Sequence, residues 1–138
     1  NSPAPRLLCY SRESSIAEKF EAMVKLGMLN SRMKDFYDIW LLSRQFDFDG
    51  PQLTEAIRLT FERRATELPA EIDAFTESFI EAKQIQWAAF RKRIGQDRVP
   101  VSFREIAASV ASFLSPIVAV FYSGKQSPTN WTAPGPWA

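Results

Sequence analysis

The chain has 138 residues, of which 24% are charged and 46% are hydrophobic, and its net charge is +1. That length and composition are typical of one globular domain with a buried core, and the balanced charge gives no argument for nucleic-acid binding. Histidine is absent, which excludes histidine-ligated metal sites and histidine general bases. The single cysteine, Cys9, excludes an internal disulfide and fits a cytoplasmic protein.

The N-terminal residues NSPAPRLLCY contain neither an initiator methionine nor a basic region followed by an apolar signal core. We interpret the chain as a piece of a longer protein. Its Pro-Ala-Pro start and the apolar run after it predict one short edge strand over residues 6–10. No apolar run approaches the ~20 residues needed to cross a bilayer, so we expect no membrane partner.

The next part of the sequence predicts a helix hairpin over residues 14–45. The first helix is expected at 14–26, where Ser15 and Glu18 have the spacing of a capping box and Gly27 ends the helix. The second is expected at 31–45, after a short turn. Because the hairpin is followed by more helical segments, we predict a mainly α fold built from helix hairpins or a small helical bundle.

Further helices are expected at residues 51–65, 71–94 and 102–114. The middle one is expected to divide near residues 80–82. Ser102 and Glu105 have the capping-box spacing at the start of the last one, and Pro116 is expected to bend or end it. Together with the hairpin these helices would make a helical domain over residues 1–122.

Residues 123–138 form a tail rich in Pro, Gly and Ser. It contains two of the four tryptophans, Trp131 and Trp137. Such a tail is either disordered or held on the body of the domain by its aromatic side chains.

A helical wheel places Lys19 at the border of the first helix's apolar arc, between Met23 and Leu26. This position has two readings. The lysine stem covers apolar surface while its ammonium stays in water, or the ammonium is held over a cleft.

The second helix carries one polar stripe on a mostly apolar circumference. Its members are Lys34, Asp35, Asp38 and Gln45. Lys34 and Asp38 are spaced for an exposed ion pair worth a few tenths of a kcal/mol. If the turn centres near Leu29, antiparallel packing sets Lys19 level with Asp38. A cation and two carboxylates would then converge, either as a phosphate-handling site or as a structural ion-pair cluster.

Residues 10–44 resemble the later part of the nucleotidyltransferase AbiEii/AbiGii toxin family. Members carry a helix with the pattern E-x-x-x-A-E-K and, after a turn, R-x-K-D-F-Y-D-I. The matching residues are Glu13, Ala17, Glu18, Lys19, Arg32, Lys34, Asp35, Phe36, Tyr37, Asp38 and Ile39. The segments 60–69 and 131–137 also resemble the C-terminal region of the family.

The resemblance implies the C-terminal half of a DNA polymerase β-like nucleotidyltransferase that acts as a toxin in a bacterial type IV toxin–antitoxin or abortive-infection system. Members bind a nucleoside triphosphate with Mg²⁺, and some transfer nucleotides to the acceptor end of transfer RNA. By this resemblance Lys19 contacts the triphosphate, and Arg32 and Lys34 are further substrate-binding candidates. An aspartate of the K-D-F-Y-D run is catalytic; we favour Asp35 for the chemistry and Asp38 for support.

The family's N-terminal half carries a Gly-Ser or Gly-Gly-Thr turn and a D-x-D acidic pair, and no such segment is found in this sequence. Asp47-Phe48-Asp49 has the D-x-D spelling, but it lies after a helix and just before Gly50-Pro51, which is typical of a turn and a helix cap. We therefore expect this chain alone to hold half of an active site, with no metal site and no bound cofactor. Its expected partners are the missing nucleotidyltransferase core, an RNA acceptor and a cognate antitoxin.

Two other interpretations stay open. The basic stripe of Arg58, Arg63 and Arg64, with Glu62, would suit a non-catalytic module that binds RNA or a protein. Alternatively, Lys19 and the aspartates only hold the hairpin together. We also expect an exposed apolar face that promotes homo-oligomers, formed by Leu7, Leu8 and part of the first helix.

Overall fold

The structure is a computed structural model, and it describes residues 11–138. The expected strand at 6–10, together with Leu7 and Leu8, lies outside these residues. The described chain is mainly α, as predicted, with one small two-stranded sheet. Its elements in order are α2 (Arg12–Leu26), η1 (Gly27–Leu29), α3 (Met33–Gln45), β1 (Phe48–Asp49), α4 (Gly50–Arg63), η2 (Asp73–Phe75), α5 (Glu77–Ala82), α6 (Gln84–Ile94), α7 (Phe103–Ser123) and β2 (Asn130–Trp131).

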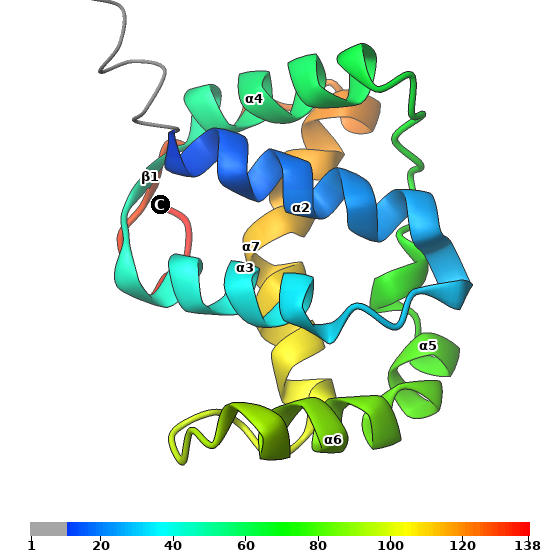
Figure 1. The fold of residues 1–138 in the computed structure, drawn as a ribbon. Helices are drawn as coiled ribbons and strands as arrows, with labels where there is room; N and C mark the ends of the chain where they lie inside the picture. Colours follow the sequence, from blue (N-terminus) through cyan, green and yellow to red (C-terminus); the bar gives the residue numbers. More distant parts are fainter. Residues whose placement is uncertain (1–10) are drawn as a thin grey trace, which may run out of the picture.

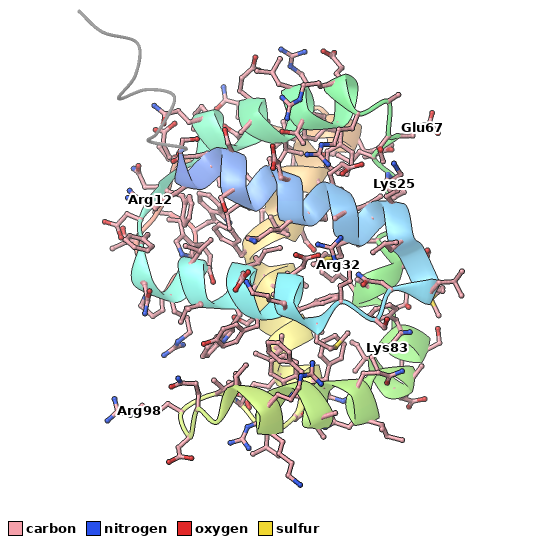
Figure 2. The ribbon with its side chains drawn as sticks, in the orientation of Figure 1. Arg12, Lys25, Arg32, Glu67, Lys83 and Arg98 are labelled. Carbon is pink, nitrogen blue, oxygen red and sulfur yellow. The ribbon has the colours of Figure 1, made fainter. Side chains whose placement is uncertain are left out.

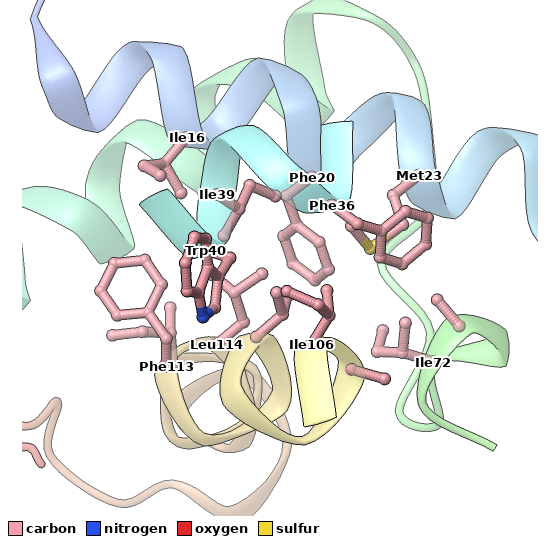
Figure 3. Packing of buried hydrophobic residues seen from close by; sticks show 14 of the residues in the cluster. Ile16, Phe20, Met23, Phe36, Ile39, Trp40, Ile72, Ile106, Phe113 and Leu114 are labelled. Carbon is pink, nitrogen blue, oxygen red and sulfur yellow. The ribbon is translucent and has the colours of Figure 1, made fainter. Parts of the chain in front are cut away.

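Helix α7 is the centre of the fold. It runs behind α2 and α3 in Figure 1 and contacts α3, α4, α5 and α6. Helix α2 lies between α3 and α4, and it packs on both. The core between these helices is apolar and combines aliphatic with aromatic side chains (Figure 3). Its largest fully buried side chains include Phe20, Phe36, Phe79, Trp87, Phe103 and Phe113.

Helix α7 is longer than the sequence predicted, because it continues through Pro116 to Ser123. A proline inside a helix removes one backbone hydrogen bond and costs about 3 kcal/mol. Buried residues lie on both sides of it, Phe113 and Leu114 before and Ile117 and Val118 after, so burial of the second half offsets that cost.

The length of α7 also corrects the expectation that no segment approaches a membrane-spanning length. By length and composition alone, α7 is long and apolar enough to cross a bilayer. In the fold its apolar residues form the core shared with α3, α4, α5 and α6, and a core helix satisfies the same criterion.

The helix starts differ in part from the predicted caps. Helix α2 begins at Arg12, earlier than predicted, and its N-cap is Ser11, whose Oγ accepts from the Ser14 backbone N–H at 3.0 Å. Ser15 is therefore inside the helix and cannot cap it. Ser102 is the N-cap residue of α7, as expected, but its hydroxyl makes no capping hydrogen bond. The break in the fourth helical region falls at Lys83, one residue beyond the predicted range.

The tail is held on the domain. Strand β2 pairs antiparallel with β1, with Phe48 opposite Trp131. The Trp131 indole N–H donates to the Ser43 carbonyl at 2.6 Å, and its ring meets Phe113 edge-on at 4.8 Å between centroids. The Trp137 ring also contacts Phe113, on which it stacks at 5.7 Å between centroids. Of the two alternatives for the tail, the structure shows the aromatic attachment.

The backbone of the tail passes so close to the start of α4 that a glycine is required there. A Cβ placed on Gly50 would lie 1.6 Å from the Pro128 carbonyl oxygen. The Gly50 N–H instead donates to the Thr129 carbonyl at 2.8 Å. Gly50 therefore joins the tail to the β1–α4 corner.

The apolar arc of α2 is buried in the described chain, and the formation of homo-oligomers stays a prediction. Ile16, Ala17, Phe20 and Met23 are buried because α2 packs between α3 and α4. Exposed large apolar side chains gather instead at the hairpin tip, where Leu29 is 89% exposed.

Candidate functional site

The α2–α3 hairpin brings Lys19 and Asp38 together, as the predicted register required. The Lys19 Nζ lies 3.0 Å from the Asp38 Oδ2. Gly27, with φ of 55°, ends α2. The buried Asn30 orders the rest of the turn, because its Oδ1 accepts from the Arg32 backbone N–H at 2.7 Å. A turn this short fixes how the two helices line up.

Asp38 forms ion pairs with two lysines. Its Oδ2 accepts a hydrogen bond from the Lys34 Nζ, one helical turn earlier, at 2.6 Å. The two lysines therefore converge on a single carboxylate oxygen. The Asp38 side chain is 16% exposed, so these pairs are partly shielded from water.

Asp35 is more deeply buried and less well satisfied than Asp38. Only 4% of the residue is exposed. Its Oδ2 lies 3.3 Å from the Arg32 Nε, which makes an ion pair, but that oxygen accepts no hydrogen bond. Burial raises the pKa of Asp35 above its ordinary value, and the nearby Arg32 and Lys19 charges only partly oppose that rise.

Two surface hollows flank these residues, and both are lined by Lys19, Arg32 and Asp35. The first, which we call the α4-side hollow, has a volume of about 260 Å³ and is also lined by Arg64. The second, the α6-side hollow, has a volume of about 500 Å³ and is also lined by Lys34 and by residues of α6. Figure 2 shows Arg32 between α2 and α3, and Arg32 lines both hollows.

A family model described as "Nucleotidyl transferase AbiEii toxin, Type IV TA system" matches residues 1–109. The chain belongs to the AbiEii nucleotidyltransferase toxin family. No curated protein and no solved structure matched the chain significantly. The family match includes the whole hairpin with its Lys19, Asp35 and Asp38. It ends within α7, so the resemblance of the 131–137 segment stays a prediction.

The AbiEii hairpin does not by itself form a magnesium site. Asp38 is occupied by two lysines and Asp35 is paired with Arg32. Within residues 11–138, no three acidic, cysteine or histidine side chains are placed to hold a metal ion. A two-metal centre requires several carboxylates on a rigid framework, and these residues do not fit that requirement.

The D-x-D sequence at residues 47–49 belongs to a turn and a helix cap, as its position before Gly50-Pro51 predicted. The Asp49 side chain caps α4 by accepting from the Gln52 backbone N–H at 2.9 Å. The Asp47 Oδ1 accepts from the Ala133 backbone N–H at 2.9 Å and so helps to attach the tail. Both carboxylates thus bind backbone.

The arginines proposed as an RNA-binding stripe on α4 are paired with acids. Arg58 binds Glu55 and Glu62 at 2.6 and 3.1 Å. Arg63 lies 3.3 Å from Glu18, and Arg64 pairs with Glu18 and Glu21 of α2. This face has little free positive charge, because α4 pairs Arg58 with its own glutamates and α2 supplies Glu18 and Glu21 to the other two arginines.

Two arginines near the family residues were missed by the sequence analysis. Arg64 was assigned only to the α4 stripe, and Arg93 was not assigned to any site. Arg93 enters the α6-side hollow from a helix far along the chain. The spacing of residues along the sequence does not connect Arg93 with Lys19. The sequence feature that could have pointed to Arg93 is the run of three basic residues in the last turn of α6.

Proposed function

We propose that the hairpin is one side of a nucleotidyltransferase active site that transfers a nucleotide from a nucleoside triphosphate to an RNA hydroxyl. The remaining carboxylates would come from a nucleotidyltransferase core outside these 138 residues. The observation that carries the proposal is the buried, incompletely bonded Asp35 beside Lys19 and Arg32 in a positively charged surface hollow. A cytoplasmic location and a cognate antitoxin, as the type IV description implies, belong to the same proposal.

In the proposed reaction, the RNA hydroxyl attacks the α-phosphorus of the triphosphate. A new P–O bond forms, the bond to the β-phosphate oxygen breaks, and pyrophosphate leaves. Asp35, which lines both hollows, accepts the hydroxyl proton on its carboxylate. A raised pKa suits a carboxylate to proton acceptance near neutral pH. Lys19 and Arg32 offset the negative charge of the phosphates.

Lys34 has a role that follows from the shared oxygen of Asp38. When Lys19 turns toward a phosphate it must weaken its contact with Asp38. The Lys34 ammonium, 2.6 Å from the same oxygen, keeps that carboxylate paired. Lys19 can therefore bind substrate without leaving the partly buried carboxylate of Asp38 unpaired. In this way Asp38 supports the site by holding Lys19 in place before substrate binds.

The proposal is tested by nucleotide incorporation with labelled triphosphates, Mg²⁺ and transfer RNA. The 138-residue chain alone should incorporate no label, whereas a protein in which this chain is joined to a family nucleotidyltransferase core should be active. Lys19→Ala and Asp35→Asn in the joined protein should each lower incorporation by at least about a hundredfold. Strong incorporation by the isolated chain would refute the divided site.

The structural interpretation of the hairpin is favoured by one observation, the double pairing of Asp38. It predicts that Lys19→Ala lowers stability but leaves incorporation by the joined protein unchanged. Thermal unfolding and nucleotide incorporation, both measured on Lys19→Ala, therefore distinguish the catalytic from the structural interpretation.

A further inference from the structure

The α6-side hollow carries more positive charge than its acids neutralise. The cationic side chains that line it come from three segments of the chain and are Lys19, Arg32, Lys34 and Arg93. The nearby carboxylates are Asp35, which lines the hollow and pairs with Arg32, and Asp38, which pairs with both lysines. Four cations against two carboxylates leave an excess of two positive charges, which suits a polyanionic ligand.

Arg93 is the cation of this hollow whose charge no acid neutralises. Among residues 11–138, no carboxylate lies within ion-pair distance of it. Its guanidinium carbon lies 5.8 Å from the centroid of the Phe90 ring. That ring is itself fixed by contacts with Trp87 and Tyr37, at 5.5 and 5.6 Å between centroids. The guanidinium therefore rests on a firm aromatic surface and keeps its N–H donors free.

The α4-side hollow differs in this respect. Its additional cation, Arg64, lies 3.6 Å from the Glu18 carboxylate and 3.5 Å from that of the buried Glu21. Glu18 also lines that hollow. A polyphosphate would have to displace these acids there, whereas the larger α6-side hollow offers it an unpaired arginine.

We infer that Arg93 binds the terminal phosphates of the nucleoside triphosphate in the α6-side hollow, so that α6 belongs to the nucleotide site. This inference rests on the proposed function. It adds one residue to the nucleotide site and states which end of the phosphate chain that residue binds. Lys19, which lines both hollows, contacts the phosphate chain as a point charge, and Arg93 holds the terminal end through its planar fork of donors. The volume of about 500 Å³ is in the range of small-ligand sites.

The test measures triphosphate binding to the 138-residue chain by isothermal titration calorimetry. The probes are inorganic tripolyphosphate, ATP and UTP, each with and without Mg²⁺, and AMP as the ligand without terminal phosphates. Arg93→Ala should weaken tripolyphosphate and ATP binding by about tenfold or more and leave AMP binding unchanged. Arg93→Lys, which keeps the charge but not the fork, should fall between Arg93→Ala and the wild type.

Lys92→Ala is the matched control. Lys92 is an exposed cation on the same helix, next to Arg93, but it does not line the hollow. It should leave binding within about twofold of the wild type. An equal loss in Lys92→Ala and Arg93→Ala would mean diffuse charge attraction and would overturn the inference.

Lys19→Ala separates this inference from the proposed function. If Lys19→Ala weakens triphosphate binding and Arg93→Ala does not, the assignment of Arg93 is wrong while the nucleotide site stands. If neither variant weakens it, the nucleotide site itself is wrong. If the wild-type chain binds no tripolyphosphate at millimolar concentration, the inference that the α6-side hollow suffices for the phosphates is overturned.

Discussion

Asp35 and Asp38 lie three residues apart on α3, and the structure predicts different effects on stability when each is changed to asparagine. Both substitutions keep the shape of the side chain and remove its charge. Asp38→Asn loses two ion pairs in which the carboxylate is 16% exposed. Partly exposed pairs contribute about 0.5 kcal/mol each, so the free energy of unfolding should fall by about 1 kcal/mol. For a chain of this size, that lowers Tm by about 3 °C.

Asp35→Asn should cause no such loss. The carboxylate is buried, its Oδ2 accepts no hydrogen bond, and its partner Arg32 has a side chain that is 61% exposed. Removing the charge relieves the cost of burying it, and it leaves Arg32 in water rather than as a second buried charge. The free energy of unfolding should stay the same or rise by up to about 1 kcal/mol.

The stability difference between the wild type and Asp35→Asn should change with pH. The other carboxylates are the same in both proteins, so this change reports the titration of Asp35. Because burial raises the pKa of Asp35 above its ordinary 3.8, the folded chain binds this proton more tightly than the unfolded chain. The resulting stabilisation is fully present below pH 3.8 and is lost as the pH rises through the raised pKa. The advantage of Asp35→Asn over the wild type should therefore be largest at neutral pH and shrink on acidification.

Urea unfolding of the wild type and both variants, followed by tryptophan fluorescence between pH 4 and pH 7.5, measures these differences. If Asp35→Asn is destabilised at pH 7 as much as Asp38→Asn, the carboxylate of Asp35 is a structural partner. Asp35 would then be a structural residue rather than a buried, incompletely bonded acid kept for chemistry.

Two further predictions concern the elements that hold the fold together. Trp131→Ala removes a side chain that is 3% exposed and donates to the Ser43 carbonyl. The free energy of unfolding, measured with urea, should therefore fall by about 3–5 kcal/mol. A loss below about 1 kcal/mol would mean that the tail contributes little to stability. Pro116→Ala restores a backbone donor inside α7 and should raise Tm in a thermal scan, whereas a lower Tm would show that the proline ring itself packs in the core.

The hairpin could be predicted because its signals are local. Gly27 ends α2, and a short turn fixes the register, so the meeting of Lys19 with Asp38 follows from counting residues. The difference between Asp35 and Asp38 could not be predicted in this way. A helical wheel puts both on one stripe, and the burial of Asp35 depends on the tertiary structure around it.

The features that the sequence analysis missed depend on contacts between distant segments. Pro116 is a helix breaker by local rules, yet the apolar residues after it are needed by a core that only the folded chain defines. The carboxylates that neutralise Arg64 come from α2, about forty residues earlier, and Arg93 reaches the site from α6. Whether each of these arginines has an acidic partner depends on how the helices pack. The periodicity of the sequence does not show that packing.

Lys19 and Asp35 are proposed to act in nucleotide transfer rather than in holding the hairpin together. The most informative test is incorporation of labelled nucleotide into transfer RNA by the chain joined to a family nucleotidyltransferase core, with the wild type and Asp35→Asn compared at equal folded concentration. Asp35→Asn should be at least as stable as the wild type and should lose incorporation by about a hundredfold or more. Incorporation at the wild-type rate by a folded Asp35→Asn protein would show that Asp35 takes no part in the transfer.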